Sequence, residues 1–190
     1  MMDSFIEEKI FEKIDFTIAG LEKASYEYCK FINCNFEGLN LFDYKFLDCS
    51  FKDCNLSMVK LPQTAFRNIY FDACKLLGLK FEDCNTFGLA FSFTDCNLNH
   101  SSFYNLKIKG TKFMNCSLQE VDFSDADLSS AYFTNCNLLK ATFSNTNLEK
   151  ANFSSAYNFN INPEINKLKK AKFSANNLSG LLQQYQIEIV

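Results

Sequence analysis

Bulky apolar residues return every five positions through most of this 190-residue chain. Counting in fives from Phe113 to Phe153 meets only Phe or Leu, and the residue two places before each of them is small or β-branched. The other positions are mostly Asn, Asp, Ser, Thr, Lys or Glu. Each five-residue unit is therefore small, polar, bulky, polar, polar.

Neither an α-helix nor a flat strand can use this pattern. On a helix, residues five apart are rotated by about 500° and spiral around the cylinder instead of forming one apolar stripe. In a flat strand, the two-residue period would place successive bulky residues on opposite faces. The pattern predicts a chain that turns a corner after each unit, so that four units close one coil and the coils stack.

Grouping the chain into coils of twenty residues places like residues above one another. One side becomes a column of Phe, in which either Phe91 or Phe93 fills the fifth coil, and the next side becomes a column of Leu. Such columns require in-register coils at the strand spacing of roughly 4.8 Å, and about eight coils would make a rod of roughly 40 Å. The structural core is expected to include Phe31, Phe51, Phe71, Phe113, Phe133, Phe153, Phe173, Leu98, Leu118 and Leu138.

Two units carry a family resemblance. Ala126-Asp127-Leu128-Ser129-Ser130 and Ala151-Asn152-Phe153-Ser154-Ser155 resemble the A(D/N)LXX signature of pentapeptide-repeat proteins. The resemblance covers nearly the whole chain and implies an all-β fold, the right-handed quadrilateral parallel β-helix. Its repeat is specific for the fold and says little about the function.

The repeat predicts three segments. Residues 1–10 are a lead-in, residues 11–178 form the β-helix, and residues 179–190 form a cap. Within the β-helix, the spacing gains two residues near 85–93, where Gly88 is a plausible hinge for a bulge. The motif also lapses over 156–166 without losing the twenty-residue phase.

The C-terminal tail has a different pattern. Leu178, Leu181, Leu182 and Tyr185 follow helical spacing, which predicts a short amphipathic helix over 179–185. Ile187 and Ile189 then alternate with polar residues, as in a strand. The tail can cover the open end of the core, and it could also pair with a second copy to make a homodimer.

Composition limits the function classes. The net charge of -3 gives no indication of direct nucleic-acid binding. No secretory signal precedes the repeats and no stretch is apolar enough to span a bilayer, so a cytoplasmic location is expected. The odd count of nine cysteines favours reduced thiols.

All nine cysteines occupy the small position of their units, and six of them form one column. They could make a metal or redox ladder. However, the chain has no CxxC and a single His, so the interpretation of Cys as a small buried apolar residue is favoured.

No residue pattern supports catalysis or a cofactor. His100 is the only imidazole and lies at an outward position, and no phosphate-binding glycine motif is present. Asp122, Asp125 and Asp127 lie on a convex surface rather than in a pocket. We therefore expect a protein that is not an enzyme and that holds no metal.

Two hypotheses for function remain. The first is a protein-interaction scaffold of unknown partner, which would bind through exposed apolar residues such as Leu47, Met58, Leu77 or Leu139. The second comes from the likeness to Qnr-type quinolone-resistance proteins, which implies a DNA mimic that binds DNA gyrase or topoisomerase IV. A DNA mimic needs a continuous acidic stripe, whereas here the outward carboxylates are mixed with basic residues, so the stripe is broken.

Overall fold

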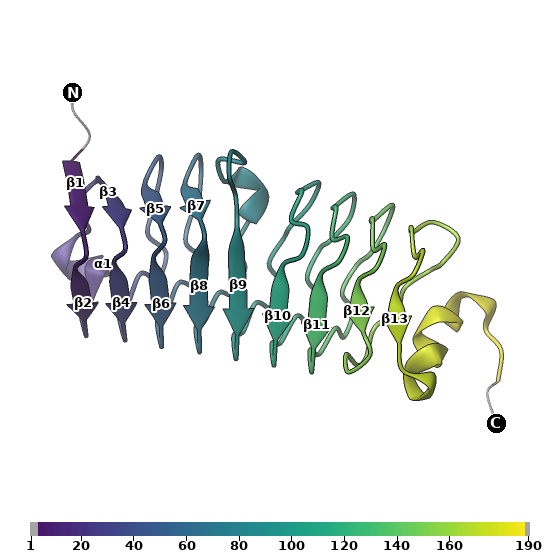
Figure 1. The fold of residues 1–190 in the computed structure, drawn as a ribbon. Coiled ribbons are helices and arrows are strands. Elements are labelled where there is room, and N and C mark those ends of the chain that lie inside the picture. Colours follow the sequence, from purple (N-terminus) through teal and green to yellow (C-terminus); the bar gives the residue numbers. More distant parts are fainter. Residues whose placement is uncertain (1–3, 189–190) are drawn as a thin grey trace.

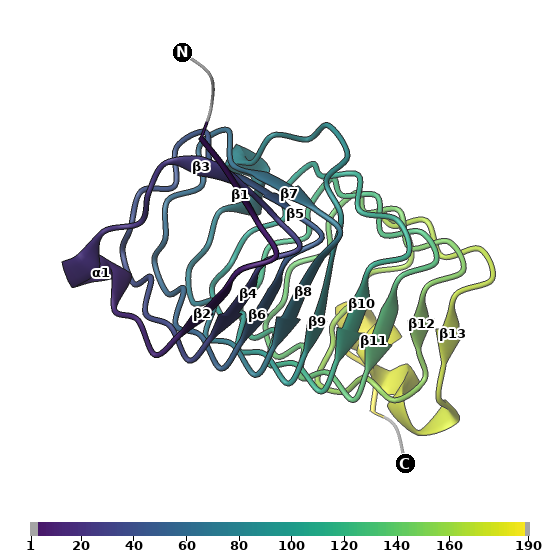
Figure 2. The same cartoon turned by 60° about the vertical axis from the view of Figure 1, so that its left-hand side comes forward.

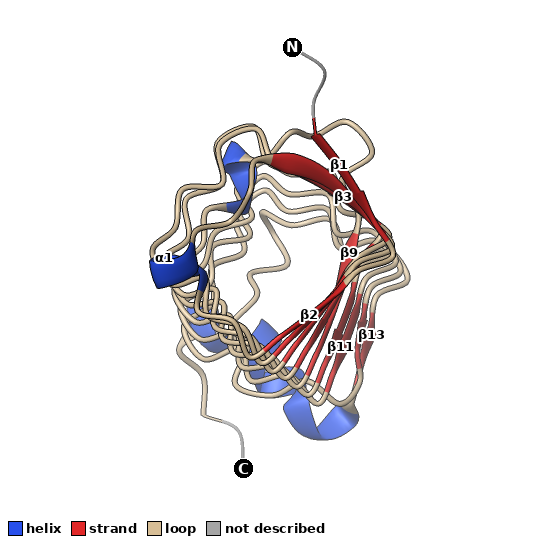
Figure 3. Ribbon diagram, turned by 90° about the vertical axis from the view of Figure 1, so that its left-hand side faces the viewer, coloured by secondary structure: helices blue, strands red, loops and turns tan. Residues whose placement is uncertain are grey.

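The computed structural model describes residues 4–188, which form a β-solenoid of about eight coils. The expected right-handed quadrilateral β-helix is therefore the observed fold. Figure 1 shows the coils stacked along the rod, with the two ends of the chain at opposite ends of it. Viewed down the axis in Figure 3, the chain encloses a tube whose walls meet at rounded corners.

Two parallel sheets form two neighbouring walls of the tube (Figures 2 and 3). The nine-stranded sheet runs the length of the rod and contains β2 (Ile10–Glu12), β4 (Lys30–Ile32), β6 (Ser50–Lys52), β8 (Ile69–Asp72), β9 (Phe91–Thr94), β10 (Lys112–Met114), β11 (Tyr132–Thr134), β12 (Asn152–Phe153) and β13 (Lys172–Phe173). The four-stranded sheet contains β1 (Ser4–Glu7), β3 (Ala24–Glu27), β5 (Lys45–Leu47) and β7 (Ala65–Arg67).

The other two walls consist of turns joined by single β-bridges, such as Asn35 to Asn55 and Ser102 to Asp122. A short helix, α1 (Phe16–Ala19), and a 3-10 helix, η1 (Phe81–Asp83), interrupt them. The first coil begins at Ser4, because β1 pairs with β3. This start is earlier than the sequence pattern suggested, and residues 4–10 are part of the solenoid rather than a lead-in.

The core consists of stacked side chains. The ring of Phe113 lies between those of Phe93 and Phe133, with centroids 5.2 and 5.1 Å away and planes within 9° of parallel. Its edges meet Phe103 and Phe123 from the opposite wall. The Leu side is fully buried at Leu98, Leu118 and Leu138, while Phe173 at the C-terminal end is only partly buried.

Each corner needs a residue in the left-handed backbone region, and this need explains one polar position of the unit. Positive φ values near 50–60° recur along the chain, often at Asn or Asp, whose short side chains tolerate that region. At one corner these side chains also bond to one another. Asn135 Nδ2 donates to Asn115 Oδ1 at 3.1 Å, and Asn115 Nδ2 donates to Asp95 Oδ1 at 3.0 Å.

The two-residue insertion lies in the fifth coil. Phe93 pairs with Phe71, 22 residues earlier, whereas the steps on either side of this one are twenty residues. The shift falls between Asn85, whose N–H donates to Thr64 O, and Ala90, whose N–H donates to Phe66 O. Gly88 in this segment has φ +67°, which suits a glycine hinge.

The C-terminal tail differs from the expected helix and strand. It forms two 3-10 helices, η2 (Ala175–Leu181) and η3 (Gln183–Tyr185), so the helical segment begins earlier and is tighter than an α-helix. Residues 186–188 contain no strand, and Ile189 lies outside the described residues. Gly180 in η2 packs closely on Phe159, so that a Cβ there would collide with the Phe159 carbonyl oxygen and ring.

Candidate functional site

The cysteines are small packing groups in the core of the solenoid. All nine are free and buried. The thiols bond to backbone carbonyls, as Cys74 Sγ does to Phe51 O at 3.3 Å. Burial raises the pKa of the Cys49 thiol to about 12 and also raises the pKa of Cys84. Such thiols are neutral and poorly reactive at pH 7.

The residues considered for chemistry lie outside the tube. His100 is exposed, and its Nδ1 is 3.3 Å from Glu120 Oε2 on the next coil. Within residues 4–188, no group of three or more His, Cys, Asp or Glu side chains is placed to hold a metal ion. In that same part of the chain, no helix is long and apolar enough to cross a bilayer.

The most distinctive surface feature is a groove in the side wall, between residues 86–92 of one coil and residues 105–112 of the next. We refer to it as the side-wall groove. The insertion creates it, because the loop at 86–89 is held against the preceding coil. Arg67 Nε donates to Phe87 O at 3.3 Å, and the Arg67 guanidinium lies 5.1 Å from the centre of the exposed Phe87 ring.

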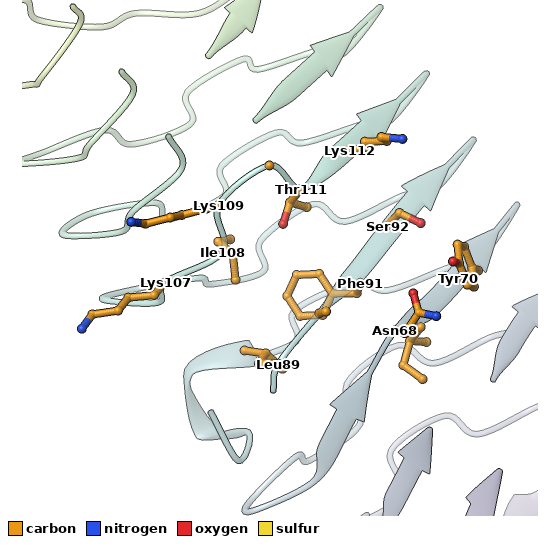
Figure 4. A pocket seen from close by; sticks show the side chains of 13 residues that line it. Asn68, Tyr70, Leu89, Phe91, Ser92, Lys107, Ile108, Lys109, Thr111 and Lys112 are labelled. Atoms are coloured by element: carbon orange, nitrogen blue, oxygen red, sulfur yellow. The ribbon is translucent and has the colours of Figure 1, made fainter. Parts of the chain in front are cut away.

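The groove has an apolar floor and a basic rim. Phe91 and Ile108 are buried at its base with Leu89 beside them, and Lys107, Lys109 and Lys112 are exposed around it (Figure 4). Its main cavity has a volume of about 430 Å³, and an adjoining cavity of about 420 Å³ shares Leu89 and Lys107. No carboxylate lines either cavity. These volumes are in the range of ligand-binding clefts, ~300–1,000 Å³.

Phe91 explains why the groove does not reach the core. It occupies the small position of its unit, the place that Ile69 takes in the preceding coil. Its ring packs against Phe81 and Phe93, with centroids 5.3 and 5.1 Å away. The aromatic side chain thus fills the volume that the displaced loop vacates. In the sequence, the register break followed by a bulky residue at a small position was the only signal of this site.

Of the four apolar residues expected to be exposed, Met58 and Leu139 are exposed, whereas Leu47 and Leu77 are half-buried, and the four do not form one patch. Met58 and Leu77 are adjacent, because Met58 N donates to Leu77 O at 2.8 Å. Leu139 is on the same wall but three coils beyond Leu77, or roughly 14 Å at the strand spacing. Leu47 lies in β5 on another wall. Met58 also borders a second, smaller cavity of about 280 Å³ between Lys60 and Lys80.

The tail residues divide into a buried and an exposed group. Leu181 packs against the core and Leu182 is half-buried, whereas Leu178, Tyr185 and Ile187 are exposed. Within the described part of the chain, three hydrogen bonds join the tail to the last coil. Ile161 N donates to Gly180 O at 2.9 Å, Tyr185 Oη donates to Glu164 Oε1 at 2.8 Å, and Asn177 Nδ2 donates to Ala156 O at 2.8 Å.

Surface charges of opposite sign are paired between neighbouring coils. Lys23 lies 3.4 Å from Asp43, and Lys52 lies 3.4 Å from Asp72. The exposed carboxylates are therefore partly neutralised by lysines one coil away, so they do not form an uninterrupted acidic strip.

Comparison with known proteins identifies the family. A family model described as a pentapeptide repeat region matches residues 24–92 and 89–153, two stretches that meet at the insertion. The chain belongs to the pentapeptide-repeat family. No curated protein matches it in sequence.

Solved structures of low sequence identity share the fold. A trypsin-treated variant of QnrB1, a plasmid-mediated fluoroquinolone resistance protein, has a TM-score of 0.57 at 20% identity, over 98% of this chain and 92% of that one. HetL, a pentapeptide-repeat protein involved in heterocyst differentiation regulation from the cyanobacterium Nostoc sp. strain PCC 7120, has a TM-score of 0.52 at 15% identity, over 90% and 87%.

Proposed function

We propose that this protein is a non-enzymatic scaffold that binds another protein through its outer walls. The observation that carries the proposal is the outer face of the nine-stranded sheet, where Tyr70, Met114 and Tyr132 are exposed. Tyr70 and Tyr132 lie three strands apart, roughly 14 Å at the strand spacing. Rigid aromatic and Met side chains are enriched at protein interfaces.

Affinity capture identifies the partner, and the dissociation constant is then measured with the purified partner. The wild-type chain is compared with a Tyr70→Ala, Tyr132→Ala double variant and with a Met58→Ala, Leu77→Ala double variant. Loss of more than about tenfold in affinity, some 1.4 kcal/mol, in either variant identifies the binding wall. A partner that binds all three chains equally would contradict the proposal for both walls.

A DNA mimic that binds DNA gyrase or topoisomerase IV is the rival candidate. The likeness to QnrB1 is one of fold, and the interleaved ion pairs weaken the acidic character that a DNA mimic needs. Supercoiling by gyrase, with and without a fluoroquinolone, separates the two candidates. A change in activity or in inhibition at micromolar protein would favour the DNA mimic over a scaffold for an unrelated partner.

Homodimerisation through the tail is compatible with either candidate. Leu178, Tyr185 and Ile187 are apolar and exposed at the C-terminal end of the rod. Light scattering at several protein concentrations, compared with a Leu178→Ser, Ile187→Ser variant, tests this part. A monomeric wild-type chain at ~100 µM would exclude a stable dimer, because a Kd well below that concentration would leave mostly dimer.

A further inference from the structure

The side-wall groove exposes unpaired backbone groups in the middle of the solenoid, at the single bridge residue Lys107 and the turn that follows it. Beyond the groove, the same three backbone hydrogen bonds join each coil of this wall to the next. From the coil of Lys107 to the coil of Asp127, for example, Asp127 N donates to Leu106 O, Ile108 N to Asp127 O, and Gly110 N to Ser129 O. The corresponding bonds join Asp127 to Asn147 and Asn147 to Lys167.

At the groove these backbone hydrogen bonds are missing among the described residues. Among the described residues, Lys107 N–H, Lys107 C=O and Lys109 C=O have no backbone partner, because the loop at 86–89 is turned toward Arg67 instead. The N–H and the C=O of Lys107 point to the same side of the chain, as the two groups of one residue do in a parallel strand. That side faces the preceding coil, because Leu106 O and Ile108 N bond to the following one. Because they line the cavities, water is their only available partner in the free protein.

The side chains around this edge define what could pair with it. Ile108 points inward onto the floor, while Lys107 and Lys109 point outward. An added strand would alternate in the same way, with an apolar side chain over Leu89 and Phe91 and the residues before and after it beside the lysines. Asp127 is 3.3 Å from Lys109, but Lys107 and Lys112 have no ion-pair partner among the described residues.

We propose that the side-wall groove binds an extended, acidic segment of a partner protein by strand addition to Lys107–Lys109. The segment would alternate acidic and apolar residues, with backbone bonds to Lys107 and Lys109, an apolar side chain on the Phe91 floor, and carboxylates beside Lys107 and Lys112. Strand addition of this kind obtains affinity from main-chain bonds and specificity from alternate side chains. The inference rests on the proposed scaffold function. The groove borders the nine-stranded sheet at Tyr70 and Lys112, whereas Tyr132, Met58 and Leu77 do not line it.

The edge can first be tested without a ligand, by amide hydrogen exchange. The Lys107 N–H is expected to exchange at least about 100-fold faster than the Asp127 and Lys167 N–H groups, which occupy the same position in paired coils. Equal protection at the three positions would overturn the proposal, because it would mean that the ladder is closed in solution.

Binding is then tested with a fluorescein-labelled nine-residue peptide that alternates Glu and Val, followed by anisotropy. The wild-type chain should bind it and should protect the Lys107 amide. Lys107→Glu should weaken binding by about tenfold, since it replaces an attraction with a repulsion at a rim site. Lys167→Glu is the matched control, because it makes the same charge change at the equivalent position of a fully paired coil, and it should bind within about twofold of wild type.

Peptide variants separate strand addition from simple charge attraction. A Lys–Val peptide should not bind. Two further Glu–Val peptides carry N-methyl groups either on the Glu or on the Val amides, and at least one of them should lose binding. If both bind as well as the parent peptide, the lysines attract an anion without strand pairing and the proposal is wrong. If no Glu–Val peptide binds at 1 mM while a captured partner depends on Tyr132 or Met58, neither of which lines the groove, the scaffold function stands and this site fails.

Discussion

Truncation of Phe113 to Ala should damage the rod more than the same truncation at its end. Phe113 is fully buried and contacts four aromatic rings, two of them stacked and two edge-on. A buried Phe→Ala substitution costs roughly 3–5 kcal/mol, and aromatic pairs add to the cost beyond their buried area. Because Phe113 has four such pairs, we expect the upper part of this range, about 4–5 kcal/mol.

Phe173→Ala is the informative comparison. Phe173 is partly buried, and among the described residues its ring pairs with two aromatic rings, Phe153, stacked at 5.3 Å, and Phe159, tilted at 5.5 Å. With about half the contacts, its truncation should cost about 2 kcal/mol. Tyr132→Ala, an exposed position beside the buried Phe133, should cost only about 0.5 kcal/mol.

The assay is guanidinium denaturation followed by circular dichroism. With a slope of about 4 kcal/mol per M, the Phe113 variant should lower the midpoint by about 1 M, and a changed slope would show that the two halves of the rod unfold separately. Phe113→Leu should recover more than half of the loss, because the adjacent column already accepts Leu. If Phe113→Ala costs no more than Phe173→Ala, the stacked column does not stabilise the rod as we infer.

Three further predictions follow from other contacts. Burial raises the pKa of Cys49 to about 12, so the folded state retains a proton that the unfolded thiol releases near pH 8.5. Above that pH, the free energy of unfolding should fall by about 1.4 kcal/mol per pH unit for this thiol. Denaturation at pH 7 to 11 should show a shallower fall in Cys49→Ala than in wild type, and identical slopes would contradict the raised pKa. Gly180→Ala should detach the tail, because the new Cβ would meet backbone and ring atoms of Phe159 within 2.6 Å. Limited proteolysis should therefore cleave this variant faster than wild type, whereas the control Ser179→Ala should be cleaved at the wild-type rate. Asn135→Ala should cost about 1–2 kcal/mol in the same denaturation assay, because it loses a side-chain hydrogen bond and places Ala in the left-handed backbone region at φ 52°. The neighbouring Thr134→Ala should be nearly neutral, and equal effects would exclude a stabilising role for the side-chain bond between Asn135 and Asn115.

The path of the chain could be predicted from the sequence because each coil contacts mainly its neighbours. A Phe or Leu every fifth residue has one way to bury all its copies, so the stacking of Phe113, Phe133 and Phe153 follows from spacing alone. The buried cysteines follow from the same spacing, and the position of the insertion follows from the break in counting.

The candidate site could not be predicted in this way, because it depends on contacts between coils. The sequence shows that two residues are inserted, but only the tertiary structure shows that Arg67 draws the loop toward the preceding coil and that Phe91 turns into the core. Those two contacts decide which backbone groups lose their partners. The same holds at the C-terminal end, where helical spacing suggested an α-helix and the close packing of Gly180 on Phe159 accompanies a 3-10 helix instead. Local periodicity therefore determined the solenoid, and long-range packing decided where its wall opens.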